Sequence, residues 1–146
     1  MHNAIPESEF LARTITPVQY IGIYELDWIL DDNQLDCEGI IVAFEDAKCL
    51  IRSQKVDFDH FDFFYYTFHG SYECRKILSS PDEPISFIGK DNKETPYGLR
   101  FQIGERPILA MAIEDGLMTI GISHWDANDN WLDFENNHLL NDQQTA

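Results

Sequence analysis

The most regular alternation of apolar and polar side chains lies in the second half of the chain, at residues 97–103. Leu99, Phe101 and Ile103 occupy every second position there, and polar residues lie between them. A period of two is typical of a strand with one buried face. The pattern therefore predicts a half-buried strand.

Two further strands are predicted immediately after it, at residues 108–113 and 117–123. The dipeptide Asp115-Gly116 between them favours a type I′ turn, which would pair Glu114 with Leu117. This register would place bulky side chains on one face of the hairpin and small ones on the other. The predicted bulky face holds Leu109, Met111, Ile113, Met118, Ile120 and Ile122, and the predicted small face holds Ala110, Ala112, Thr119, Gly121 and Ser123.

The first half of the chain predicts strands at 18–30, 38–44, 48–52 and 58–68, where β-branched and aromatic residues are frequent. In the first of these, most large apolar residues share one parity, and 31–34 is a polar turn cluster. Residues 58–68 are aromatic at both parities, which suits either a strand buried on both sides or a buried helix. The composition of 79–84 and 90–96 predicts loops.

Helical signals occur only near the two ends. Ser8 is placed to cap a short helical turn that runs to Arg13, and residues 131–140 predict a second helix. We expect 1–8 and 141–146 to be frayed. With 146 residues, the chain predicts a single globular domain, 1–146. The expected fold is mainly β, with α+β as the alternative: a single antiparallel meander sheet of about six strands and one or two short peripheral helices.

The charge balance narrows the classes of partner. The chain has 26 acidic and 10 basic residues, which gives a formal net charge of −16. A field of this sign repels phosphate backbones and anionic lipid headgroups, so we expect neither nucleic-acid nor membrane binding. Three cysteines without paired spacing, and an N-terminus without a signal-peptide pattern, predict a cytoplasmic protein.

No motif in the sequence supports catalysis. The chain lacks a phosphate-binding glycine loop, a nucleophile elbow and any histidine or cysteine spacing typical of a metal site. We therefore expect no cofactor and no metal, and the sequence favours a non-enzymatic function.

The acidic residues are concentrated in one stretch. Eleven carboxylates lie between Glu25 and Asp62, against three basic residues. The leading hypothesis is an acidic binding module that masks a basic surface on a protein partner, since opposed charges speed encounter and give specificity. The candidate partner-binding residues are Asp31, Asp32, Asp36, Asp57, Asp59 and Asp62. They would form one acidic face if the two segments that carry them meet at one end of the sheet.

In its broad character, as a small, acidic, single-domain chain with few cysteines, the protein is similar to bacterial immunity proteins. Those proteins neutralise basic nucleases or related toxins by stoichiometric binding. The similarity implies that the partner is a bacterial toxin. It is a similarity of composition, so it assigns no role to any residue.

Two alternatives come from other parts of the chain. The aromatic run after residue 58 either fills the core or forms a ledge for a ligand. In the second case the protein would be a small-molecule-binding or catalytic β-domain, with a pocket lined by Tyr65, Tyr66, His69 and Trp125. The third hypothesis is a homo-oligomer that uses the small face of Ala110, Ala112 and Gly121.

Overall fold

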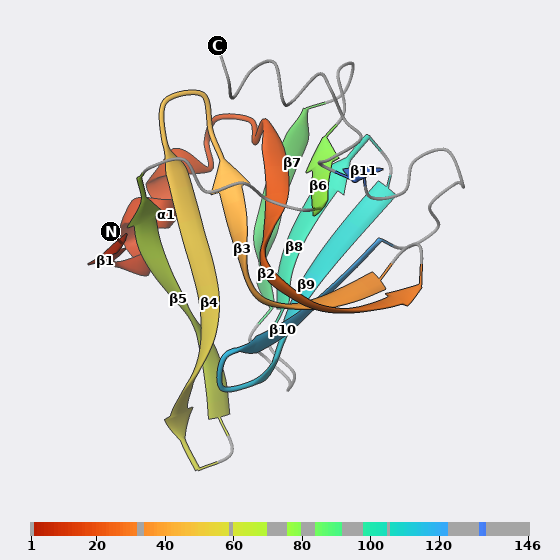
Figure 1. Ribbon diagram of the computed structural model, residues 1–146. Helices are drawn as coiled ribbons and strands as arrows, with labels where there is room; N and C mark the ends of the chain where they lie inside the picture. Colours follow the sequence, from red (N-terminus) through yellow and green to blue (C-terminus); the bar gives the residue numbers. More distant parts are fainter. Residues whose placement is uncertain are drawn as a thin grey trace.

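The computed structural model describes residues 2–31, 34–58, 60–69, 76–79, 84–91, 98–104, 106–122 and 132–133. The fold is mainly β, as predicted: one large antiparallel sheet curls into a half-barrel and is accompanied by one short helix (Figure 1). The elements are β1 (His2–Ile5), α1 (Glu7–Arg13), β2 (Tyr20–Asp31), β3 (Gln34–Ala43), β4 (Lys48–Asp57), β5 (His60–Phe68), β6 (Lys76–Ser79), β7 (Ile85–Asp91), β8 (Gly98–Ile103), β9 (Arg106–Glu114), β10 (Leu117–Ile122) and β11 (Leu132–Asp133).

Two meanders make up the sheet, and β3 joins them. The main path runs β1-β5-β4-β3-β10-β9-β8-β7, and β2, β6 and β11 pair off it. One edge of β3 pairs with β2, while the other edge is shared, first by β10 at residues 34–37 and then by β4 at residues 40–43. The sheet therefore branches at Gly39. A side chain there would be crowded, because a Cβ atom would lie 2.8 Å from the carbonyl oxygen of Ile51.

The end of the β9–β10 hairpin is attached to β4 across this branch. The backbone N–H of Gly116 donates to the carbonyl oxygen of Ser53 at 2.8 Å, and the Ser53 hydroxyl donates to the carbonyl oxygen of Glu114 at 3.0 Å. The N–H of Lys55 donates to the Asp115 carboxylate at 2.9 Å. These three hydrogen bonds hold the two branches of the sheet together.

The register of this hairpin differs from the prediction. Glu114 pairs with Leu117, as expected, but Met118 then pairs with Ala112, because a bulge lies between Leu117 and Met118. Gly116 has a φ of 80°, whereas Asp115 is not among the described residues with positive φ. A type I′ turn needs positive φ at both positions, while a type I turn followed by a left-handed glycine produces a bulge.

The bulge moves β9 to the opposite face. Ala110 and Ala112 lie in the core with Met118 and Ile120, whereas Ile113 is exposed. The predicted bulky and small faces are therefore wrong for β9. The small face proposed for a homo-oligomer does not exist as one surface, since Ala110 and Ala112 are buried inside the half-barrel.

Strand β2 also changes face along its length. Ile21 and Ile23 are part of the main core. Beyond Glu25, Leu26 is the residue that packs against this core. Glu25 has a φ of 54°, in the left-handed region that only glycine adopts without strain. The single parity predicted for 18–30 is therefore wrong, because the backbone turns over at Glu25.

The main core fills the inside of the half-barrel, and α1 supplies its central aromatic side chain. Phe10 is fully buried; its ring stacks on Tyr65 at 4.8 Å between centroids and meets Phe87 edge-on at 5.4 Å. A smaller cluster packs on the opposite face of β2–β5 and consists of Tyr20, Ile41, Ala43, Leu50 and Phe68. Most of 58–68 is thus a strand rather than a helix, which settles the alternatives left open by periodicity. The burial on both sides that was expected with a strand is only partial: Phe63, Tyr65 and Phe68 are buried, whereas Phe58 and Phe64 are exposed.

Several boundaries depart from the sequence prediction. The segment expected to be frayed, 1–8, includes β1 and the start of α1, and the helix begins after Pro6 rather than at a Ser8 cap. The edge strand β7 was not predicted, and it extends into the loop expected at 90–96. Leu132 and Asp133 form β11 where a helix was expected, and the rest of 131–140 lies outside the described residues.

Candidate functional site

The predicted acidic residues that the structure describes fall on two different hairpins. Asp36 lies on β3 and is half-buried, Asp57 is exposed at the end of β4, and Asp62 lies on β5. Asp31 ends β2, and Asp32 and Asp59 lie outside the described residues. The β2–β3 and β4–β5 hairpins end at separate places in Figure 1, so the condition for a single acidic face, that the two segments meet, is not fulfilled among the described residues.

The β2–β3 hairpin carries charge of one sign only. Residues 20–43 contain six carboxylates and neither lysine, arginine nor histidine. Glu25, Asp27 and Glu38 are exposed. At Glu38 the neighbouring strand β4 supplies a counter-charge, because the Arg52 guanidinium lies 3.6 Å from its carboxylate. The hairpin is therefore an acidic ribbon on the body of the domain.

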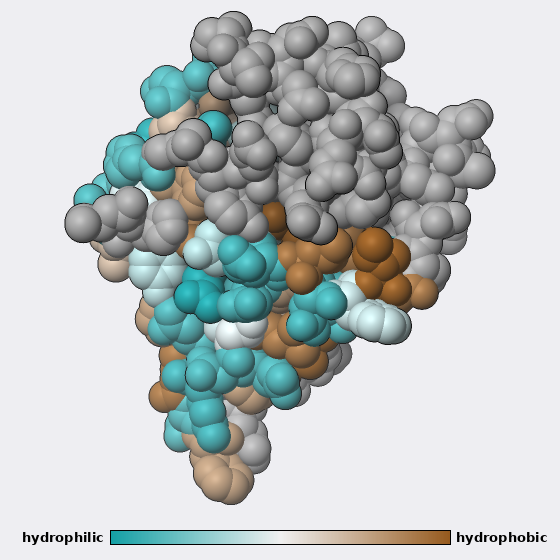
Figure 2. Space-filling view, in the orientation of Figure 1, coloured by the Kyte–Doolittle hydropathy of each residue, from teal (hydrophilic) through white to brown (hydrophobic). Residues whose placement is uncertain are grey.

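Large apolar side chains are exposed near the end of the same hairpin. Trp28, Ile29 and Leu30 have exposed fractions of 65%, 47% and 49%. Figure 2 shows brown apolar residues beside teal hydrophilic ones in the region where Figure 1 places the end of this hairpin. Consecutive exposed apolar residues of this size, beside charged groups, are typical of a protein–protein interaction site.

Two irregularities in β2 account for this exposure. The register with β3 shifts between Leu26 and Trp28 and again between Ile29 and Asp31. Each bulge inserts an extra residue and re-aims the side chains that follow it. Together with the left-handed backbone at Glu25, these register shifts end the alternation of buried and exposed side chains that places Ile21 and Ile23 in the core. Bulges and strained residues are frequent at functional sites.

Asp36 lies directly beside Trp28 on this surface, since the two residues are cross-strand partners. On its other side Asp36 is paired with Thr119 of β10. The Thr119 hydroxyl already donates to the carbonyl oxygen of Leu35 at 3.3 Å and accepts from the Gln34 amide at 3.3 Å. The Oδ1 atom of Asp36 is shielded from solvent, and no described residue donates a hydrogen bond to it.

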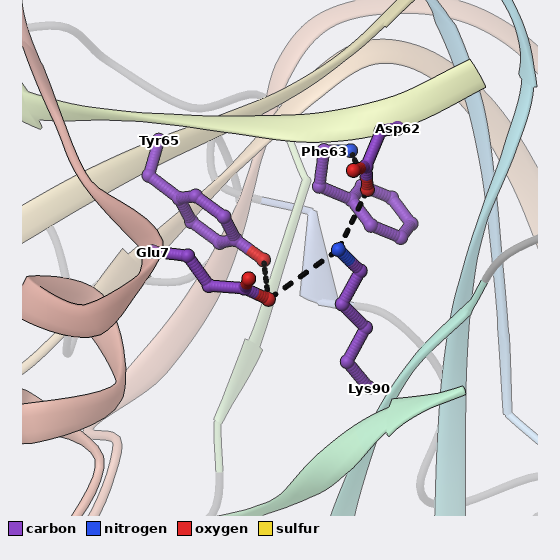
Figure 3. Close-up of polar contacts among 5 residues, drawn as sticks. All are labelled: Glu7, Asp62, Phe63, Tyr65 and Lys90. Atoms are coloured by element: carbon purple, nitrogen blue, oxygen red, sulfur yellow. Dashed lines mark hydrogen bonds and ion pairs between the residues drawn. The ribbon is translucent and has the colours of Figure 1, made fainter. Parts of the chain in front are cut away.

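A second polar cluster lies between α1, β5 and β7 (Figure 3). The Lys90 ammonium is 2.7 Å from a carboxylate oxygen of Asp62 and 3.4 Å from one of Glu7. The same Glu7 oxygen accepts a hydrogen bond from the Tyr65 hydroxyl at 3.4 Å. The Lys90 side chain is only 12% exposed, whereas the two carboxylates are more open to solvent.

The electrostatics of this cluster favour a structural role. Burial by itself lowers the pKa of Lys90, but the hydrogen bond and charge of Asp62, with those of Glu7, outweigh burial and leave the pKa raised. Burial, together with the nearby carboxylates, raises the pKa of Tyr65. A lysine with a raised pKa stays protonated at neutral pH, and in that form it is neither a nucleophile nor a base. The cluster therefore connects α1, β5 and β7 by charge.

The alternative aromatic pocket is divided by the sheet. Tyr65 points into the main core, whereas Tyr66 packs on the opposite face and accepts a hydrogen bond from the Gln54 amide. His69 is exposed just after β5, and Trp125 lies outside the described residues. Tyr65 and Tyr66 therefore do not line one pocket.

The described cysteines and acidic residues show no metal site. Burial raises the pKa of the Cys37 thiol to about 12 and that of Cys49 to about 11, so both are neutral thiols in the core. Within the described part of the chain, no group of three or more histidine, cysteine or carboxylate side chains is arranged to hold a metal ion. Nor is any described helix long and apolar enough to cross a membrane.

Three comparisons with known proteins identified no relative of this chain. No family model matches the chain, no curated protein matches it, and no solved structure matches it. The function is therefore argued from the residues themselves.

Proposed function

We propose that the protein is a non-enzymatic acidic binding module that masks a basic surface on a protein partner. The observation that carries the proposal is the β2–β3 hairpin, where exposed Trp28, Ile29 and Leu30 lie on a ribbon whose charged residues are all carboxylates. The similarity of composition to bacterial immunity proteins supports a toxin as the partner.

The two components of this surface have separate physical roles. Acidic side chains attract a cationic surface over several ångströms and raise the association rate, an effect that salt screens. The apolar residues lose water on contact and stabilise the bound complex, and tryptophan is among the residues that most often dominate binding energy. A surface with both properties suits a basic partner that has an apolar recess.

The test uses two variants with matched changes in charge. The first replaces Asp27, Asp31 and Asp32 of the hairpin by lysine. The second replaces Glu45, Asp46 and Glu114, which are exposed away from the end of the hairpin, by lysine. Each variant raises the net charge by the same six units. Cationic proteins are first captured from the native extract at low salt on the immobilised wild-type chain and are then purified. The rate at which each purified protein associates is measured with the wild type, the hairpin variant and the control variant.

The proposal expects association with the captured protein to slow by about tenfold or more in the hairpin variant, and to lose most of its salt dependence. The control variant should change the rate much less. Equal slowing by both variants would show that only net charge matters, and would contradict a binding surface on β2–β3. Failure to capture any stoichiometric cationic protein would contradict the proposed function itself.

A further inference from the structure

We propose that Trp28 and Asp36 form a subsite for an arginine side chain of the partner. The inference rests on the proposed function and names the group that the β2–β3 surface recognises. In the bound state, the guanidinium lies over the indole ring of Trp28 and donates hydrogen bonds to the Asp36 carboxylate.

The first argument is the position of the two residues. Trp28 and Asp36 are directly paired across β2 and β3, so their side chains project from the same face of the ribbon. Directly opposed residues have Cβ atoms about 4.5–5.5 Å apart, a separation that one planar cation can bridge. The high exposure of Trp28 leaves its ring accessible from solvent.

The second argument is the state of the Asp36 carboxylate. One of its oxygens is shielded from solvent without a donor from the described residues, although the residue as a whole is only half-buried. Part of the desolvation penalty for this charge is therefore already present in the unbound protein. A carboxylate in this condition gains more from a cation than a fully hydrated carboxylate, because less water has to be removed.

The third argument concerns which cation fits. The indole ring offers a negative π face, and an arginine guanidinium can stack on it while its in-plane N–H groups remain free to donate. A lysine ammonium is a compact, strongly hydrated charge, and it cannot satisfy both partners with one flat group. The pair therefore favours arginine over lysine, and both over a neutral side chain.

The experiment titrates the folded protein with short peptides that differ only at one central residue: arginine, lysine or citrulline, a neutral analogue of arginine. Binding is followed by NMR at the Trp28 indole N–H and the Asp36 amide. The variants are Trp28→Ala, Trp28→Phe and Asp36→Asn. Asp46→Asn, an exposed residue between β3 and β4, is the matched charge control.

The arginine peptide is expected to bind about threefold or more tightly than the lysine peptide, and citrulline should give no saturable shift. Trp28→Ala and Asp36→Asn should each weaken arginine binding by about tenfold, Trp28→Phe should retain part of it, and Asp46→Asn should change it by less than about twofold. Thermal unfolding of each variant confirms that the fold is intact.

Two results would overturn the subsite. Equal binding of arginine and lysine, with Asp46→Asn as harmful as Asp36→Asn, would show general attraction by net charge. Absence of any arginine-dependent shift at Trp28 at low salt would remove the subsite outright. Neither result would contradict the proposed function, because that function is tested separately by the charge-reversal variants of β2–β3.

Discussion

Lys90 and Asp62 form an ion pair of 2.7 Å that connects β7, at one end of the sheet path, with β5, near the other end. Glu7 of α1 joins the same pair at 3.4 Å from the ammonium. Since β5 and β7 are not neighbours in the sheet, no backbone hydrogen bonds connect them along the described path. The charged contact is therefore one of the interactions that hold the half-barrel in its curled form, together with the packing of Phe10.

Replacing Lys90 by methionine should lower the free energy of unfolding by about 1–2 kcal/mol, because two partly exposed carboxylates lose their shared cation while the apolar stem is kept. Urea denaturation measures the change. A double-mutant cycle with Asp62→Asn should show coupling between the two substitutions. Additive effects of the two changes would contradict a direct contribution of the ion pair.

Ser53 gives a second stability prediction. Its side chain is fully buried, and its hydroxyl supplies the hydrogen bond to the Glu114 carbonyl that attaches the β9–β10 hairpin to β4. Ser53→Ala should therefore cost about 1–2 kcal/mol of unfolding free energy, since the carbonyl loses its donor. The control is Ser86→Ala on the exposed side of β7, which should change stability by less than about 0.5 kcal/mol. Equal effects at the two positions would remove the role given to Ser53.

Glu25 offers a prediction of opposite sign. Its φ of 54° strains any residue with a side chain, so Glu25→Gly should raise the free energy of unfolding by about 0.5–1 kcal/mol. Asp27 is exposed on the same strand and is not among the described residues with positive φ. Asp27→Gly should therefore lower stability by about the same amount. Chemical denaturation of both variants checks the contrast, and destabilisation by both would argue against backbone strain at Glu25.

The buried thiol of Cys37 predicts a pH dependence. Burial raises its pKa from 9.0 to about 12, so above pH 9 the unfolded chain releases a proton that the folded chain keeps. Fewer protons in the unfolded state mean that stability falls as pH rises from 9 towards 12. Between pH 8 and pH 11, the wild type should lose about 2–3 kcal/mol more than Cys37→Ala. Parallel stability curves for the two proteins would show that Cys37 does not titrate in this way.

The strands with clear patterns could be predicted from sequence, and those without could not. The alternation around Leu99 and Phe101 identified β8 correctly. The edge strand β7 has glycine and lysine near its end and no regular alternation, so it was missed. Its position depends on pairing with β8 and on the bridge between Ile85 and Val18, which are contacts between distant residues.

The candidate site was predicted in part. The acidic character of 25–38 is visible in the sequence, and Asp36 was among the residues singled out. The exposure of Trp28 was not predicted, because Trp28 shares the parity of most large apolar residues in 18–30 and that alternation gives no sign of the bulges after Leu26. The pairing of Lys90 with Asp62 and Glu7 has no sequence signal at all, since the three residues belong to three different elements.

The amino-acid sequence by itself determined the class of fold and the negative sign of the net charge. Side-chain periodicity and charge are properties of the chain that need no knowledge of contacts. The tertiary structure decided which face of each strand is buried. A single bulge beside Gly116 reversed the faces of β9, and strain at Glu25 with two bulges exposed Trp28. Bulges change register by one residue, and with a period of two that small change exchanges core and surface.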